Sequence, residues 1–323
     1  MQDAMFPEPE GVQPAAVTPA LQALAAALPD RVHLGTSSWT FPGWAGLVYA
    51  RRAGSDTLAR DGLAAYARHP LLRSVSLDRV FYRPLETAQY AAYARQVPDG
   101  FRFVVKAPAL VCDAVTREAG GRGTRPNPLF LDPQSALQQV VQPAMQGLGD
   151  KLGVLVFQIS PLPSSWLTRR DALLDRLDTL LGALPRGLLA AVEVRDAAWL
   201  GPDFASVLRA HRTAYCLGLH PRLPPVDEQL PMLRALWPGP LVCRWNLHRR
   251  HGAHGYETAK VGYEPFDRLV DPDPATRSVL AKVATATASA GQPVYVTINN
   301  KAEGSAPCSV IALAEEIVRR RAV

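Results

Sequence analysis

The chain has 323 residues, of which 48% are apolar and 20% are charged, and its formal net charge is +6. This is the composition of an ordinary soluble globular protein, with room for one large domain or two small ones. No apolar run approaches the roughly 20 residues that cross a bilayer, so neither a membrane span nor a membrane partner is expected.

Residues 1 to about 30 have no strand pattern and are predicted to form an N-terminal extension. Within it, TPALQALAAALPD predicts one short helix that Thr18 caps and Pro29 ends. The first residues carry acids where a signal peptide carries Lys or Arg. Four cysteines lie far apart without a CxxC pair, which indicates free thiols in a reducing compartment. A cytoplasmic location is therefore expected.

After this extension, eight short apolar or β-branched runs alternate with helical stretches. Most runs are nearly continuously apolar, as expected for strands buried on both faces of a parallel sheet. The predicted strands are 32–37, 74–78, 101–107, 152–159, 188–194, 213–219, 240–245 and 293–299. The predicted helices cover 57–69, 85–97, 133–146, 169–184, 201–212, 224–239, 274–291 and 307–322, with the weakest pattern at 224–239.

Eight strands alternating with about eight helices predict an α/β protein with a (β/α)8 TIM-type barrel. The competing doubly wound sheet usually carries a Gly-rich phosphate turn after its first strand, where this chain reads GTSSWTFPGW. We therefore predict an extension over residues 1–30 and a single barrel domain over 31–323.

Polar and aromatic side chains gather where the predicted strands end. In a barrel the C-terminal strand ends and the loops after them build the site. One polar strand end is usually a satisfied structural group, but convergence from six strands predicts a pocket. The candidates are Trp39, Asp78, Tyr82, Lys106, Gln158, Glu193, Arg195, Arg244, Asn246, Asn299 and Asn300.

Two connections are too long to be plain turns, and loops of this length are usually functional or disordered. They contain residues 114–127, rich in Gly and Arg, and 247–262, rich in Arg and His. Both follow predicted strands, so we expect them over the same face of the barrel.

Six motifs occur in a specific order: GTSSW, FYR, FVVKAP, LVFQISP, VEVRDAAW and NNKAEGSAP. With them, residues 32 to about 320 resemble the DUF72 (YecE-like) family. The resemblance implies a TIM barrel and no particular reaction. It carries over to Lys106, Gln158, Glu193, Arg195, Arg244, Asn299 and Asn300. The chain departs from the family pattern with Ser76, Asp78, Asp196 and Asn246, so no histidine role carries over.

Three cations, Lys106, Arg195 and Arg244, are predicted at one end of the barrel. Buried cations need anionic partners, and Glu193 and Asp78 supply only part of that charge. A phosphate or carboxylate ligand would complete the balance. In the alternative, Glu193 pairs with Arg195 or Lys106 only to hold the barrel mouth together.

Metal and covalent chemistry have weaker signals. HRRHGAH places His248, His251 and His254 three residues apart, which fits no standard closed zinc site. Cys308 follows a proline at a helix start and is more typical of a packing residue than of a nucleophile. We predict no metal and no cofactor, and leave open whether these histidines bind one.

Two functions stay open. The first is an enzyme acting on a small phosphorylated or carboxylated substrate, with Glu193, Lys106 and Asp78 as the acid/base groups. The second is a nucleic-acid-binding protein or phosphodiester hydrolase, in which the basic loops contact phosphates and exposed aromatics stack on bases. The pI of about 9.3 favours nucleic acid slightly. The oligomeric state cannot be read from the sequence.

Overall fold

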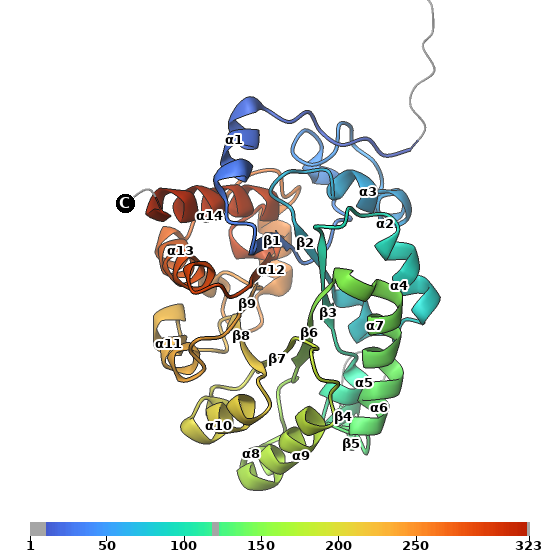
Figure 1. The fold of residues 1–323 in the computed structure, drawn as a ribbon, viewed down its shortest axis with the longest axis vertical. Coiled ribbons are helices and arrows are strands. Elements are labelled where there is room, and N and C mark those ends of the chain that lie inside the picture. Colours follow the sequence, from blue (N-terminus) through green and yellow to red (C-terminus); the bar gives the residue numbers. More distant parts are fainter. Residues whose placement is uncertain (1–10, 118–122, 322–323) are drawn as a thin grey trace, which may run out of the picture.

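Eight parallel strands close into a barrel in the computed structural model, which describes residues 11–117 and 123–321 (Figure 1). Around the barrel the strand order is β1-β10-β9-β8-β7-β6-β3-β2. The TIM-type barrel and all eight predicted strands are thereby confirmed. The strands are β1 (Val32–Thr36), β2 (Ser74–Leu77), β3 (Arg102–Lys106), β6 (Leu152–Gln158), β7 (Ala190–Glu193), β8 (Ala214–Leu219), β9 (Leu241–Trp245) and β10 (Val294–Ile298).

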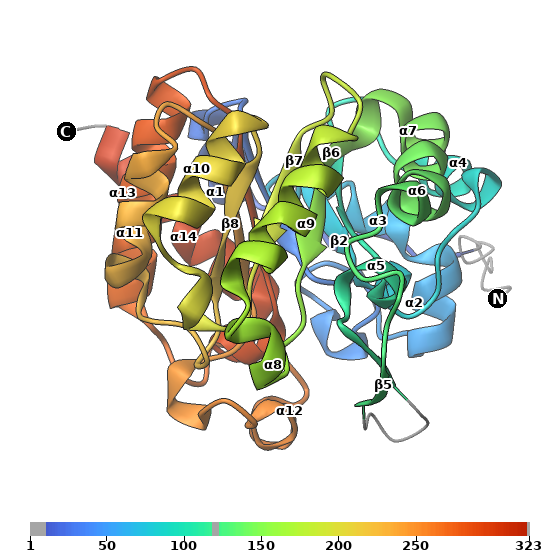
Figure 2. The same ribbon diagram turned by 90° about the horizontal axis from the view of Figure 1, so that it is seen from below.

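Helices follow the strands and surround the barrel (Figures 1 and 2). The α-helices are α1 (Pro19–Ala27), α2 (Ser55–Asp61), α3 (Leu63–Tyr66), α4 (Thr87–Ala94), α5 (Ala109–Cys112), α6 (Pro133–Ala136), α7 (Gln142–Leu148), α8 (Ser164–Leu167), α9 (Arg170–Gly182), α10 (Pro202–Ala210), α11 (Val226–Ala235), α12 (Tyr256–Tyr263), α13 (Pro274–Ser289) and α14 (Ala306–Arg321). Short 3-10 helices cover Pro42–Trp44, Asp78–Phe81, Gly149–Lys151, Ala197–Trp199, Arg249–His251 and Asn300–Ala302, and a π-helical turn covers Leu137–Val141. Within the described residues, no helix has the length and hydropathy to cross a membrane.

Two details differ from the expectation. The predicted helix 57–69 is divided at Gly62, which ends α2 and begins α3. The connection after β9 contains α12, a helix that the sequence pattern does not announce. It has no side-chain cap and contains Gly262, so its stability comes from packing of residues such as Ala259 and Tyr263.

The N-terminal extension packs outside the barrel. Its helix α1 (Pro19–Ala27) is capped by Thr18, whose hydroxyl accepts from the Leu21 N–H, as predicted. Arg73 donates to the carbonyls of Ala25 and Pro29 and ties the end of α1 to the start of β2. Residues 1–10 of the predicted extension lie outside the described residues.

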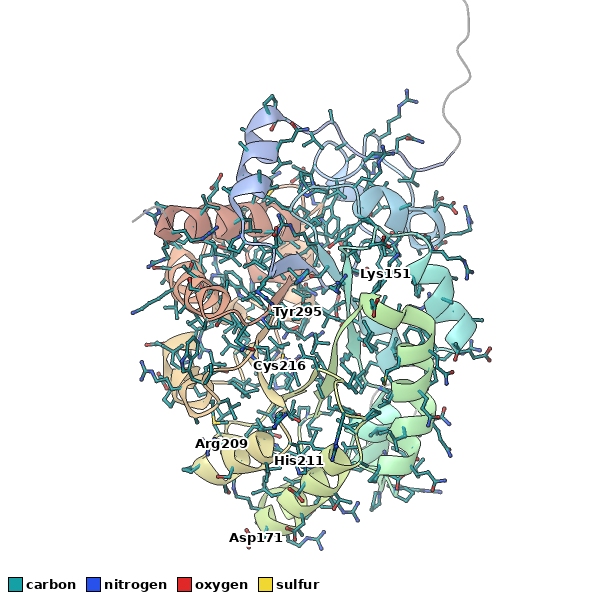
Figure 3. The ribbon with its side chains drawn as sticks, in the orientation of Figure 1. Lys151, Asp171, Arg209, His211, Cys216 and Tyr295 are labelled. Carbon is teal, nitrogen blue, oxygen red and sulfur yellow. The ribbon has the colours of Figure 1, made fainter. Side chains whose placement is uncertain are left out.

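Side chains inside the barrel form layers, because successive strand residues point to opposite faces. An inner cluster of mostly small apolar side chains fills the middle of the barrel. It includes Tyr295, whose ring stacks on His33. Cys216 and Tyr295 lie at the barrel centre in Figure 3. The other members are Val104, Val154, Val156, Ala191, Ala214 and Val242. In β3, β6, β7 and β9, the inward position two residues further along the strand is polar.

Candidate functional site

A polar layer closes the barrel at the C-terminal ends of the strands. Lys106, Gln158, Glu193 and Arg244 each stand two residues after an inner apolar residue of the same strand, so their side chains point inward. All four are at most 9% exposed. The polar layer is therefore a continuation of the barrel core into its mouth.

Arg244 is the centre of this layer. Its Nη1 donates to Glu193 Oε2 at 2.6 Å and to Gln158 Oε1 at 3.1 Å. Its Nη2 donates to both carboxylate oxygens of Asp78 at 2.7 Å. Burial would lower the pKa of Arg244, but the carboxylates of Asp78 and Glu193 more than offset burial and raise it. The guanidinium thus stays charged and joins strands on opposite sides of the barrel.

Glu193 is the internal counter-charge and is 0% exposed. Besides Arg244 it forms an ion pair with Arg195, whose Nη2 lies 2.9 Å from Glu193 Oε1, and it accepts from Asn246 Nδ2 at 3.2 Å. Burial would raise the pKa of Glu193, but Arg195 and then Arg244 pull it below its usual range. With its oxygens held by three donors, Glu193 is ionised and poorly placed to take up a proton.

Strand register explains how these groups meet. Gln158 lies beside Glu193 in the pairing of β6 with β7, and Gly218 lies beside Arg244 in the pairing of β8 with β9. A Cβ on Gly218 would stand 3.5 Å from Glu193 Cγ and 3.0 Å from a methyl of Leu223. A side chain at Gly218 would therefore press on Leu223 and come into contact with Glu193.

Lys106 differs from the two arginines. Within the described residues it has neither a hydrogen bond nor an ion pair, and its Nζ lies 3.6 Å from the ring centre of Phe81. Burial and the nearby Arg244 lower the pKa of Lys106 to about 8, against the opposing effect of Asp78 and Glu193. Three cations therefore face two carboxylates, and the unbalanced charge resides on Lys106.

Two more predicted residues belong to this cluster. Arg195 also donates to Gln158 Oε1 at 2.9 Å, so that amide oxygen accepts from both arginines. Asn246 donates to the backbone carbonyl of Arg244 at 3.0 Å in addition to its bond with Glu193. The cluster thus contains seven of the eleven sequence candidates. They are Asp78, Lys106, Gln158, Glu193, Arg195, Arg244 and Asn246.

The paired asparagines after β10 have other partners. Asn299 donates to the Ser37 hydroxyl at 2.9 Å, and its Oδ1 accepts from the Lys301 N–H. Asn300 is 1% exposed, and its Oδ1 accepts from Trp44 Nε1 and from the Ala306 N–H. Asn300 therefore fixes the turn from β10 into α14, while Asn299 lies at the rim beside the end of β1.

The two aromatic candidates lie away from the cluster. Trp39 is 5% exposed and donates from Nε1 to the Leu58 carbonyl at 2.9 Å, so it packs in the wall. Tyr82 is 86% exposed and contacts Phe81 edge to face. In the described part of the chain, neither forms a hydrogen bond or a ring contact with Lys106 or Arg244, which a sequence pattern of strand ends could not foresee.

Sequence reasoning missed three groups around the cluster. Ser76 donates to Asp78 Oδ1 at 2.6 Å and holds that carboxylate toward Arg244. Tyr256, on α12, interacts with Arg195 and stacks on His220. Burial lowers the pKa of His220 to about 4, with a smaller contribution from the positive charge of Arg195, so the imidazole ring is neutral. Only the long loop after β9 hinted at Tyr256.

The histidine run after β9 is engaged in local contacts. His248 accepts from the Arg250 N–H and caps the following turn, and His251 Nε2 lies 2.7 Å from the Tyr263 hydroxyl. In the described part of the chain, no three side chains of His, Cys, Asp and Glu come together as a metal-binding group.

The two long connections reach the same end of the barrel. Figure 2 shows α12 and strand β5 (Gly123–Pro126) at the lower end, where α8 follows β6. β5 pairs antiparallel with β4 (Val115–Arg117). Residues 118–122 of this predicted loop lie outside the described residues. The expected common face is confirmed for the described parts.

Comparison with known proteins agrees with this architecture. The model of a family described as "Protein of unknown function DUF72" matches residues 33–323. A DUF72 family protein of known structure from Enterococcus faecalis is 16% identical, with a TM-score of 0.56, covering 89% of this chain and 95% of that one. One from Thermotoga maritima is 20% identical, with a TM-score of 0.56 and coverages of 88% and 98%. No curated protein matches the chain.

Proposed function

The chain belongs to the DUF72 family, whose description assigns no function, and we propose that its barrel mouth binds a small phosphorylated or carboxylated molecule. The observation that carries the proposal is the buried ammonium of Lys106, which has no hydrogen-bond or ion-pair partner among the described residues and lies beside a network in which both arginines already have carboxylate partners. A buried cation without a counter-ion is costly, and an anionic ligand offsets that cost.

A second observation supports an anionic ligand. The Nε–H of Arg244 is buried and has no acceptor among the described residues. A buried donor left unsatisfied costs about 1–3 kcal/mol, so a ligand oxygen that reaches it gains that amount on binding. Lys106 and the Arg244 Nε–H would then contact the same anion.

The proposed chemistry is proton exchange by Lys106. Its pKa of about 8 lies close to neutrality, where an acid/base group is most efficient. Glu193 and Asp78, predicted from the sequence as further acid/base groups, act in this proposal as fixed counter-charges, because Arg244 holds both. We place the protein in the cytoplasm, because all four cysteines are free thiols.

Calorimetric titration with inorganic phosphate and with acetate tests the proposal. Lys106→Met should weaken binding at least about tenfold, which is about 1.4 kcal/mol. Lys282→Met, on the exposed outer face of α13, is the matched control and should leave the affinity unchanged. Measured near pH 8 in two buffers of different ionisation enthalpy, wild type should take up protons on binding, because the anion raises the pKa of Lys106. Equal binding by wild type and Lys106→Met would refute the proposal.

Nucleic-acid binding remains the alternative, supported by Tyr82, whose exposed ring could stack on a base. Against it, Arg249 and Arg250 in the loop after β9 are already engaged, with the Leu223 carbonyl and with Asp271. A titration of single-stranded DNA at several salt concentrations separates the two. Several phosphate contacts give a steep loss of affinity with salt, whereas one buried anion does not.

A further inference from the structure

A concave site lies on the outer wall, at the N-terminal end of the barrel. It is a groove of about 730 Å³ between α11 and α13, next to the end of α10. These helices follow one another around the barrel in Figure 1. The starts of β8 and β9 form the floor, where Tyr215 and Leu241 are each 1% exposed. The groove is thus separated from the polar layer by the length of the strands.

The walls of the groove are apolar. Leu230 and Leu233 come from α11, and Val279 and Val283 come from α13. All four are only partly buried, so the groove offers apolar surface that the fold does not cover. Trp237, at the end of α11, adds a large ring that is 52% exposed. Pockets of about 300–1,000 Å³ with mostly apolar walls are typical of small-molecule sites.

The rim of the groove is cationic. Arg209, Arg212, Arg234 and Lys282 line it, and its lining contains no Asp or Glu. Within the described residues none of these four cations forms an ion pair. Arg209, labelled in Figure 3, donates to the Ala235 carbonyl and so leans toward α11. The rim therefore presents uncompensated positive charge from three helices around one apolar hollow.

Apolar walls and a cationic rim select a ligand with an apolar body and an anionic end. A second copy of the chain fits poorly, because two such rims would face each other with like charges. We propose that this groove binds a free medium-chain fatty acid, with the alkyl chain between α11 and α13 and the carboxylate at the rim. Each methylene buried there leaves water, which favours binding, and the carboxylate gains charge-assisted hydrogen bonds from Arg or Lys.

The test is a calorimetric titration of the full chain with dodecanoate, kept below its micelle-forming concentration. Dodecanol serves as the uncharged analogue, and acetate serves as the analogue that keeps the carboxylate but lacks the alkyl chain. We expect saturable, one-to-one binding of dodecanoate, at least about tenfold weaker binding of dodecanol, and no groove binding of acetate. Equal affinity for dodecanoate and dodecanol, or no saturable binding of either, would overturn the proposal.

Variants locate the site. Ala286 lines the groove on α13 and is exposed, so Ala286→Phe fills the hollow without disturbing the core. It should weaken dodecanoate binding at least about tenfold. Ala275→Phe, also exposed on α13 but outside the groove, is the matched control and should bind as wild type does. Lys282→Met should weaken the binding of dodecanoate and leave the affinity for dodecanol unchanged. Lys106→Met should change neither affinity.

Two further results would contradict the inference. Unchanged dodecanoate binding by Ala286→Phe would place the ligand elsewhere. A dimer of the wild-type chain that Ala286→Phe converts to a monomer in sedimentation velocity would assign the groove to a second copy. Because Lys106→Met and Lys282→Met act on opposite ends of the barrel, failure of one site leaves the test of the other intact.

Discussion

Replacing Glu193 by Gln removes the negative charge at the centre of the polar layer and keeps the shape of the side chain. In the native protein this carboxylate accepts from Arg244 at 2.6 Å and from Asn246 at 3.2 Å, and it forms an ion pair with Arg195 at 2.9 Å. After the change, Arg195 has lost its carboxylate and Arg244 retains only Asp78. Both guanidinium groups remain at most 8% exposed, so water cannot replace what is lost.

The expected cost is large. Breaking a buried ion pair by removing one partner costs about 3–5 kcal/mol, because the other charge stays buried and uncompensated. At about 2 °C per kcal/mol for a chain of this size, Glu193→Gln should lower the Tm by about 6–10 °C. The folded-state pKa of Glu193 lies below its usual value, so its stabilisation is present above about pH 4.5 and is lost as the pH falls further.

The assay is thermal unfolding followed by circular dichroism at pH 7, with urea unfolding as a second measure. Asp61→Asn is the matched control, since it removes a carboxylate from an exposed pair with Arg60. Such surface pairs contribute about 0–1 kcal/mol, so this variant should unfold within about 2 °C of wild type. If Glu193→Gln unfolds at the wild-type temperature, the buried network does not hold the barrel mouth and the reasoning is wrong.

Three further outcomes are expected. Lys106→Met should be neutral or stabilising at pH 7. The pKa of Lys106 is lowered to about 8. The free energy of unfolding of wild type, measured in urea relative to this variant, should therefore rise between pH 8 and 10 by about 1 kcal/mol per pH unit. A difference in unfolding free energy that does not change with pH would contradict the burial of this charge. Gly35→Ala should prevent folding or cost several kcal/mol, because its Cβ would lie 1.9 Å from the Ser74 carbonyl oxygen. Gly262→Ala, which has open space around it on α12, should instead stabilise the folded protein by about 0.5–1 kcal/mol in the same urea assay. Asn300→Ala should cost about 1–3 kcal/mol of stability in thermal melts, because it leaves the Trp44 indole N–H and the Ala306 N–H without their acceptor. A loss of stability no greater than that of Asn299→Ala would be evidence against the role of Asn300 in the turn.

The sequence by itself determined the barrel and its polar end. Continuous apolar runs alternating with helical stretches are typical of strands buried on both faces and covered by helices, and their number favoured a barrel, so the eight strands were predictable within a residue or two. The position of polar residues at strand ends was equally readable. Lys106, Gln158 and Glu193 are the last residues of their strands, and Arg244 is the last but one.

Only the tertiary structure decided which of these residues meet. Strand register places Gln158 beside Glu193 and Gly218 beside Arg244, and no local pattern records a register between strands far apart in the chain. Asn300 and Trp39 resemble site residues in the sequence but bond to the framework, because a polar group at a strand end can satisfy either a ligand or a turn.

The groove between α11 and α13 was also invisible in the sequence. Its apolar residues have the helical spacing of any core-facing stripe, and its cations have the spacing of any solvated face. Whether a stripe is covered depends on how closely two helices pack, which is set by side-chain volumes at their contact and by the strands beneath them. That distance is a property of the folded barrel and not of any one segment.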